Sequence, residues 1–153
     1  MIFRVTTLAT VGFIAGTLGM WAAERDIPAQ LISADVLENP VQPGGVLRIR
    51  YHVLRTRECS LRIDRVLYDA QRAREVLEDR ANLSTTAPVG ADTYIVLVKI
   101  PVTFSEGPAS YQTVSRYECN PLHRIWPIIS IRPEIRFDIK GPALPADRVV
   151  VTP

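Results

Sequence analysis

The sequence predicts an all-β domain, a two-sheet sandwich of about seven strands, that follows one N-terminal transmembrane helix. Three observations lead to this expectation. Residues 5–23 form an uncharged, largely apolar run. From residue 30 onward, apolar and polar residues alternate with a period of two, which is typical of strands with one buried face. The 12 prolines and 8 glycines are spread along the chain, as expected for frequent turns.

The N-terminal run has the length of a membrane span. It follows Arg4 directly, and its 19 residues, 5–23, at about 1.5 Å each would cover about 28 Å of a hydrocarbon core of about 30 Å. Trp21 suits an interfacial anchor. Signal-peptide cleavage near Ala23 would place bulky Met20 or Trp21 where small residues are required. We therefore expect an uncleaved signal anchor, and a cleaved, secreted soluble accessory or inhibitor domain is the alternative.

The charges around this run predict its orientation. Arg4 precedes it, whereas Glu24-Arg25-Asp26 carries no net positive charge. The positive-inside bias then keeps the N-terminus in the cytoplasm and exports the domain. In a bacterium, the protein would be a single-pass inner-membrane protein with a periplasmic C-terminal domain. The expected organisation is an anchor (1–26), a sandwich (27–140) and a flexible, proline-containing tail (141–153).

Gly12 and Gly16 form a G-x-x-x-G pair within the run, and Gly19 lies one turn further. Such spacing lets two membrane helices approach closely, which makes homodimerisation through the helix one expectation. The pattern also arises by chance in helices rich in small residues.

The strands are expected in order along the chain. The clearest one places Leu47, Ile49, Tyr51 and Val53 on one face. The strand at 60–68 begins in the same way, and its pattern shifts at Asp64-Arg65, which suggests a bulge. Segment 69–84 is ambiguous between strand and helix, with a turn near Ala70 and a strand at 75–83 preferred. The remaining strands are expected at 30–37, 93–100 (apolar on both faces, hence central), 109–119 and 129–139.

The two cysteines, Cys59 and Cys119, are expected to form a disulfide, since paired cysteines are common in exported domains. Tyr117-Glu118-Cys119 resembles the immunoglobulin pattern, in which a tyrosine lies two residues before the second cysteine. The resemblance implies an immunoglobulin-like architecture, although Cys59 lies at a strand end and no tryptophan lies on the third strand. The alternative is that Cys119 and His123 act as thiolate and base or as metal ligands.

Two surfaces are candidates for binding. The first is the loop at 120–128, in which tryptophan and arginine are frequent binding hot spots, and its candidate residues are Leu122, His123, Arg124, Ile125 and Trp126. The alternative is that Ile125 and Trp126 fold back over the core. The second is a basic face represented by Arg48, Arg50 and Arg62. It is either a solvated sheet face or a weak surface for anionic lipids or envelope polymers.

The motifs of common enzyme classes are missing from the sequence, and we expect neither catalysis nor a cofactor or metal. The net charge of +2 is too small to predict nucleic-acid binding. The run YECNPLHRIWPI, with the short N-terminal segment, resembles small uncharacterised proteins of bacteriophages and prophages of proteobacteria. The resemblance implies an envelope setting. We therefore expect a membrane-anchored binding or structural module with a protein partner in the cell envelope.

Overall fold

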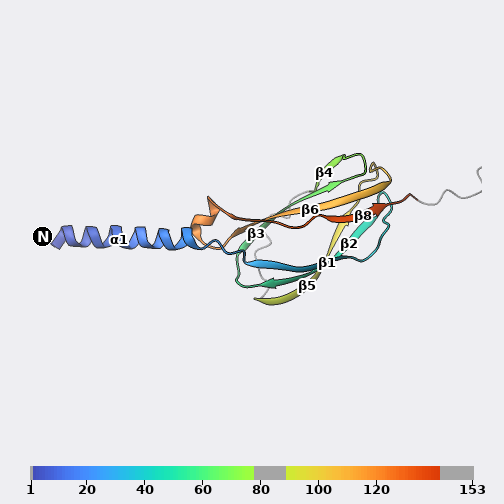
Figure 1. Ribbon diagram of the computed structural model, residues 1–153. Coiled ribbons are helices and arrows are strands. Elements are labelled where there is room, and N and C mark those ends of the chain that lie inside the picture. Colours follow the sequence, from blue (N-terminus) through green and yellow to red (C-terminus); the bar gives the residue numbers. More distant parts are fainter. Residues whose placement is uncertain (1, 78–88, 142–153) are drawn as a thin grey trace, which may run out of the picture.

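The computed structural model describes residues 2–77 and 89–141 and shows a helix that leads into two packed β-sheets (Figure 1). The described residues form ten elements in chain order: α1 (Ile2–Ala23), β1 (Ala29–Val36), β2 (Val46–Arg55), β3 (Ser60–Tyr68), β4 (Arg74–Leu77), β5 (Gly90–Lys99), β6 (Gly107–Glu118), the 3-10 helix η1 (Pro121–Arg124), β7 (Ile128–Ile131) and β8 (Ile135–Ile139).

The strands form two antiparallel sheets. The first sheet has the order β1-β2-β5, and the second has the order β4-β3-β6-β7, with β8 pairing with the other end of β6. After β1 the chain crosses to the second sheet, where Val41 forms a parallel bridge with Ile139. This order agrees with the immunoglobulin arrangement, in which strands A, B and E face strands C, F and G. It differs from the seven-strand form in having β4 beside β3.

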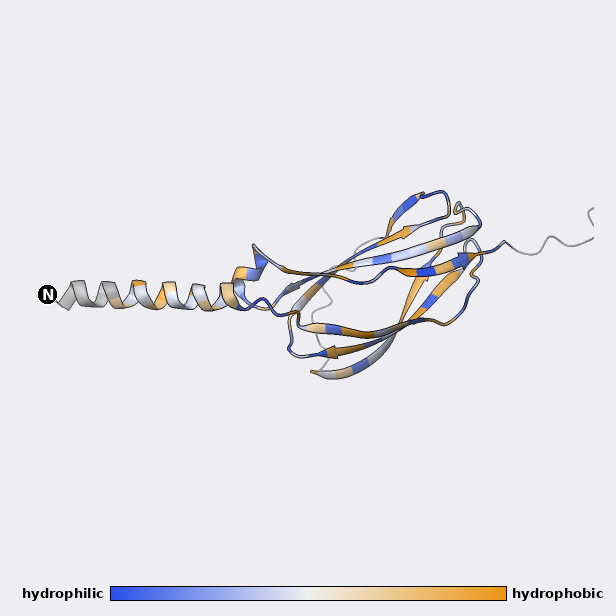
Figure 2. Cartoon of the chain, viewed as in Figure 1, coloured by the Kyte–Doolittle hydropathy of each residue, from blue (hydrophilic) through white to orange (hydrophobic). Residues whose placement is uncertain are grey.

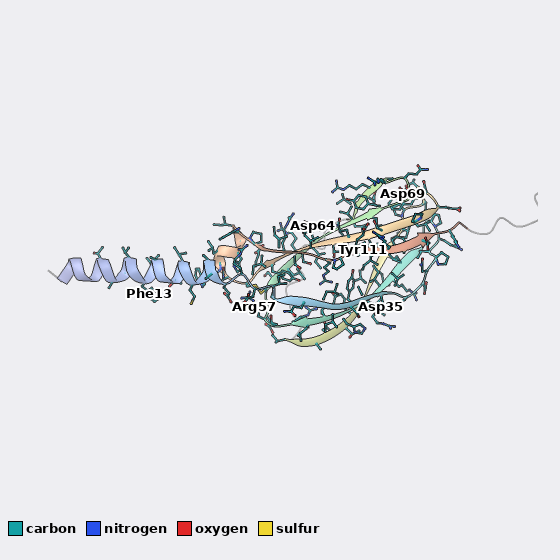
Figure 3. The ribbon with its side chains drawn as sticks, viewed as in Figure 1. Phe13, Asp35, Arg57, Asp64, Asp69 and Tyr111 are labelled. Atoms are coloured by element: carbon teal, nitrogen blue, oxygen red, sulfur yellow. A yellow bond between two sulfur atoms is a disulfide. The ribbon has the colours of Figure 1, made fainter. Side chains whose placement is uncertain are left out.

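The main core lies between the sheets. The predicted alternation in β2 is confirmed, because Leu47, Ile49, Tyr51 and Val53 are all buried. They pack with buried side chains from both sheets, and Tyr111 lies between the two (Figure 3). The buried partners are Leu67, Val98, Ile100, Tyr111, Phe137 and Ile139. The strand register is fixed by this burial, because a shift of one residue would move the apolar side chains of β2 from the core to the solvent face.

The transmembrane helix is the part of the predicted fold that the structure contradicts. Residues 2–23 form a continuous helix that extends away from the sandwich (Figure 1). Among the described residues, no helix is long and apolar enough to cross a membrane. Figure 2 colours the described part of this helix by hydropathy, with pale segments between orange ones.

Three expectations about single strands also need correction. Within the described residues β5 pairs only with β2, so it is an edge strand, and its outward Ile95 and Leu97 are exposed. The β3–β6 register is continuous through Asp64 and Arg65, and the irregularity lies instead in β1, between Leu31 and Ser33. The expected strand at 129–139 is divided into β7 and β8, because Pro133 cannot donate a ladder hydrogen bond.

The ambiguous segment begins with a turn and then the short strand β4. Asp69 organises this turn by accepting hydrogen bonds from the backbone N–H groups of Gln71 (2.9 Å), Ala73 (2.8 Å) and Ser105 (3.1 Å). The rest of the expected strand at 75–83, beyond Leu77, and residues 142–153 of the expected tail lie outside the described residues.

Candidate functional site

The predicted disulfide is confirmed. Cys59 immediately precedes β3 and Cys119 immediately follows β6, and their Cα atoms are 4.3 Å apart. The adjacent residues Ser60 and Glu118 are partners in the β3–β6 ladder. The bond therefore joins neighbouring strands of the same sheet, whereas the immunoglobulin disulfide joins the two sheets.

His123 has a structural position. It is fully buried, its Nδ1 accepts a hydrogen bond from the Cys119 backbone N–H (3.3 Å), and its Nε2 lies 3.4 Å from Asn120 Nδ2. The Asn120 side chain in turn caps η1 by accepting from the His123 N–H (3.2 Å). Because the Cys119 sulfur is bonded to Cys59, the alternative of a Cys119–His123 thiolate–base or metal pair is wrong.

The loop at 120–128 is fastened to the end of α1. Arg25 donates hydrogen bonds to the carbonyl oxygens of Trp126 (2.9 Å) and Pro127 (3.1 Å), and its guanidinium lies 4.1 Å from the centre of the Trp126 ring. Asn120 Nδ2 donates to the Trp21 carbonyl oxygen (3.3 Å). The loop is thus held from both sides, by the disulfide and by the helix end.

The predicted loop residues divide into two groups. Leu122 is half-buried and His123 is buried, whereas Arg124, Ile125 and Trp126 are exposed. Ile125 is 86% exposed and Trp126 is 55% exposed, so the expectation that they fold back over the core is wrong. Ile125 and Trp126 therefore project from a loop whose backbone is held in place.

The exposed apolar surface continues onto the outer face of the second sheet. The ladders place Ile131 beside Val114, and Val76 beside Val66. We call these residues, with Ile129, the outer patch: Ile129, Ile131 and Val76 are exposed, and Val66 and Val114 are half-buried. Two arginines flank it, since Ile129 pairs with Arg116 and Arg116 pairs with Arg62.

The predicted basic residues do not share a face. Arg48 and Arg50 lie on β2, on the outer face of the first sheet, whereas Arg62 lies on β3, on the outer face of the second. Arg48 forms a salt bridge with Glu38 (3.2 Å), and Arg50 lies opposite Asp35 in the ladder. Of these three predicted residues, Arg62 is the one that borders the outer patch.

Sequence reasoning missed a set of charged and aromatic side chains between the sheets. Arg55 forms a salt bridge with Asp92 (3.0 Å). Arg132 donates to the Tyr94 hydroxyl (3.2 Å) and lies 5.0 Å from the centre of the Tyr51 ring. Arg65 has the same strand parity as Leu61, Ile63 and Leu67, so the alternation itself places it inward. The alternate positions of Leu61, Ile63, Arg65 and Leu67 could therefore have predicted an inward Arg65. The interpretation of Asp64-Arg65 as a bulge prevented that prediction.

These contacts change the titration of the interior groups. Burial raises the pKa of Tyr111 to about 12, although the charge of Arg65 beside it acts in the opposite direction. Burial alone would lower the pKa of Arg132. The facing hydroxyls of Tyr94 and Tyr117 outweigh burial and raise this pKa above the ordinary value. Arg132 is therefore a permanent positive charge, held half-buried at the edge of the space between the sheets.

The described residues contain no group of three or more histidine, cysteine, aspartate or glutamate side chains arranged to hold a metal ion. On α1, no other described atom approaches within 4 Å of the Cβ positions that substitution of Gly12 or Gly16 would create. Homodimerisation through these glycines stays a prediction. No protein-family model matches the chain, and no curated protein is significantly similar to it.

Proposed function

We propose that this chain is an extracytoplasmic binding module that holds a protein partner on the outer patch and acts without catalysing a reaction. The observation that carries the proposal is the group of exposed side chains Ile129, Ile131 and Val76 on one sheet face. In an isolated chain these side chains would contact water, and exposed apolar side chains gathered on one face commonly mark interaction sites, although Asp64 and Gln112 lie between the two edges of this patch.

The surroundings of the patch suggest the chemistry of the partner. Arg62 and Arg116 border its apolar centre, and Asp64 compensates only Arg116 (2.8 Å). Ile125 and Trp126 extend the apolar surface from the neighbouring loop. A partner with an apolar contact area and acidic side chains at its border fits this arrangement, since apolar centres with charged rims are typical of protein interfaces.

The proposed location depends on the disulfide. Cys59 and Cys119 are bonded, and such bonds persist in oxidising compartments such as the bacterial periplasm. The resemblance to small phage and prophage proteins supports the same setting, with a partner in the host cell envelope. The rigid attachment of the loop to α1 supports binding by a preformed surface rather than by a segment that orders on contact.

The test compares two matched substitutions by the size of the native complex. Ile131 on the outer patch is 66% exposed and Ile32 on the outer face of β1 is 64% exposed, so Ile131→Asp and Ile32→Asp introduce the same charge at equally open sites. In extracts of the native host, the wild-type protein and Ile32→Asp should elute in a complex larger than the monomer. Ile131→Asp should elute as the free chain. Equal elution of the two variants would contradict the proposal.

A further inference from the structure

A small, partly open cavity lined by both polar and apolar side chains lies between the two sheets, apart from the outer patch. Its volume is about 20 Å³, and strands of both sheets line it. Val53 and Arg55 come from β2, Tyr94 from β5 and Tyr117 from β6, and Arg132 lies just beyond β7. Because one water needs about 10–15 Å³ on this measure, the cavity has room for one small guest.

The charges around this cavity do not balance. Arg55 is paired with Asp92 and Arg57 is paired with Glu24. Arg132 instead faces the hydroxyls of Tyr94 and Tyr117 and the Tyr51 ring, all of which are neutral. Among the described groups that line the cavity and their ion-pair partners, one positive charge is therefore left without a carboxylate. Arg132 is half-buried, and a partly desolvated charge is stabilised by a counter-charge beside it.

Hydrogen-bond donors at the cavity are also unused. Tyr117 is buried with its hydroxyl beside Arg132, and because a guanidinium can only donate, the hydroxyl hydrogen has no acceptor among the described residues. The Nε–H group of Arg55 is likewise buried without an acceptor. Buried donors of this kind are rare in folded proteins, and each one calls for an acceptor such as a water or an ion.

We infer that this cavity is a binding site for one small monovalent anion, of which chloride is the natural probe. A single negative charge matches the excess carried by Arg132, and a halide accepts hydrogen bonds from Tyr117 and Arg55. A water molecule would satisfy the donors but leave the charge of Arg132 uncompensated. Sulfate and phosphate exceed the cavity in size and the excess in charge.

The inference is tested by thermal unfolding of the purified full chain in sodium chloride or sodium bromide, exchanged against sodium gluconate at constant ionic strength. Gluconate is too large for the cavity. The unfolding midpoint should rise with halide concentration and reach a plateau, because a ligand that binds only the folded state stabilises it by mass action. Equal midpoints in halide and gluconate at every concentration would overturn the inference.

Variants separate this site from general salt effects. Tyr117→Phe keeps the ring and removes the hydroxyl, and it should raise the half-saturating halide concentration about tenfold. Arg132→Met should abolish the halide dependence, whereas Arg50→Met, which removes the same charge from the outer face of β2, should retain it. An unchanged halide response in Tyr117→Phe would overturn the inference even if Arg132→Met failed to fold.

A second measurement shows the occupant directly. Crystals grown in sodium bromide should give an anomalous peak inside the cavity bordered by Tyr117 and Arg132. Bromide peaks confined to the protein surface, with a water in the cavity, would identify an adventitious ion only and overturn the inference.

Discussion

Asp69 shows at the scale of a single residue how one carboxylate holds a turn. It is buried and accepts three backbone hydrogen bonds, which join the β3–β4 turn to Ser105. Asp69→Asn should lower the free energy of unfolding by about 2 kcal/mol, because charged acceptors form stronger hydrogen bonds than neutral ones. Urea unfolding measures this change. The control Asp64→Asn, which breaks a more exposed pair with Arg116, should cost less than about 1 kcal/mol.

The effect of Asp69 should depend on pH in a defined direction. Burial alone would raise its pKa, but hydrogen bonds from the N–H groups of Ser105, Ala73 and Gln71 outweigh burial and lower the pKa below 3.8. A carboxyl with a lowered folded-state pKa stabilises the fold above its unfolded-state pKa and loses this contribution as pH falls through the folded-state value. The difference between wild type and Asp69→Asn should therefore be constant near neutrality and shrink below about pH 4. A difference that grows in acid would contradict this account.

Ser115 is a residue whose polar group works against stability. Its side chain is fully buried on the inner face of β6, and its hydroxyl has no hydrogen-bond partner among the described residues. Ser115→Ala removes the unpaired group with little change in volume. The free energy of unfolding should therefore stay the same or rise by up to about 1 kcal/mol, and the unfolding midpoint should not fall. Differential scanning calorimetry tests this. A clear fall in the midpoint would show that an ordered water satisfies the hydroxyl.

At the scale of elements, Arg25, two residues beyond the end of α1, holds the far side of the loop after β6. Its two hydrogen bonds reach the carbonyl oxygens of Trp126 and Pro127. Arg25→Met should free the loop and accelerate amide hydrogen exchange at Ile125 and Trp126 by about tenfold, because local opening becomes easier. Arg124→Met, an exposed arginine of the same loop, should leave exchange unchanged. If both variants gave equal exchange, the disulfide and the hydrogen bond from Asn120 to Trp21 would hold the loop without Arg25.

The elements differ in how far the sequence predicts them. Strict alternation places β2 correctly, because one buried face leaves a clear period of two, whereas β3 was placed in range but with a bulge that the structure does not have. The run at 93–100 was misleading, because an apolar outer face at Ile95 and Leu97 resembles a central strand although the described β5 lies at an edge. The helix at 2–23 was predictable as a helix. The prediction that it crosses a membrane is contradicted, because no helix of the described part of the chain is long and apolar enough to do so.

The candidate surface was partly predictable for a similar reason. The exposed Ile125 and Trp126 were identified by residue type, but the pairing of β7 with β6, which adds Ile129 and Ile131, depends on long-range contacts. Arg48 and Arg62 were grouped because their strands are consecutive. Consecutive strands in a sandwich can belong to different sheets, and the sequence pattern does not record which sheet a strand joins.

For the whole molecule, the disulfide should be a major source of stability. It closes a 60-residue separation between Cys59 and Cys119, for which the chain-entropy model gives about 4 kcal/mol. Reduction, or the double substitution to serine, should lower the free energy of unfolding by about 3–4 kcal/mol. Guanidinium unfolding with and without reductant checks this value. An unchanged midpoint would show that the core alone holds the two strands together.

The central claim is that the outer patch, rather than the other sheet face, holds a protein partner. The most direct test is a map of photo-crosslinks in cells, with a photoreactive residue placed in turn at patch positions and at exposed apolar positions of the first sheet. The patch positions are Val76, Ile129 and Ile131, and the controls are Ile32, Ile95 and Leu97. The account predicts adducts with the same protein from the three patch positions and none from the controls. Adducts only from the first sheet, or none from Ile129 and Ile131, would contradict it.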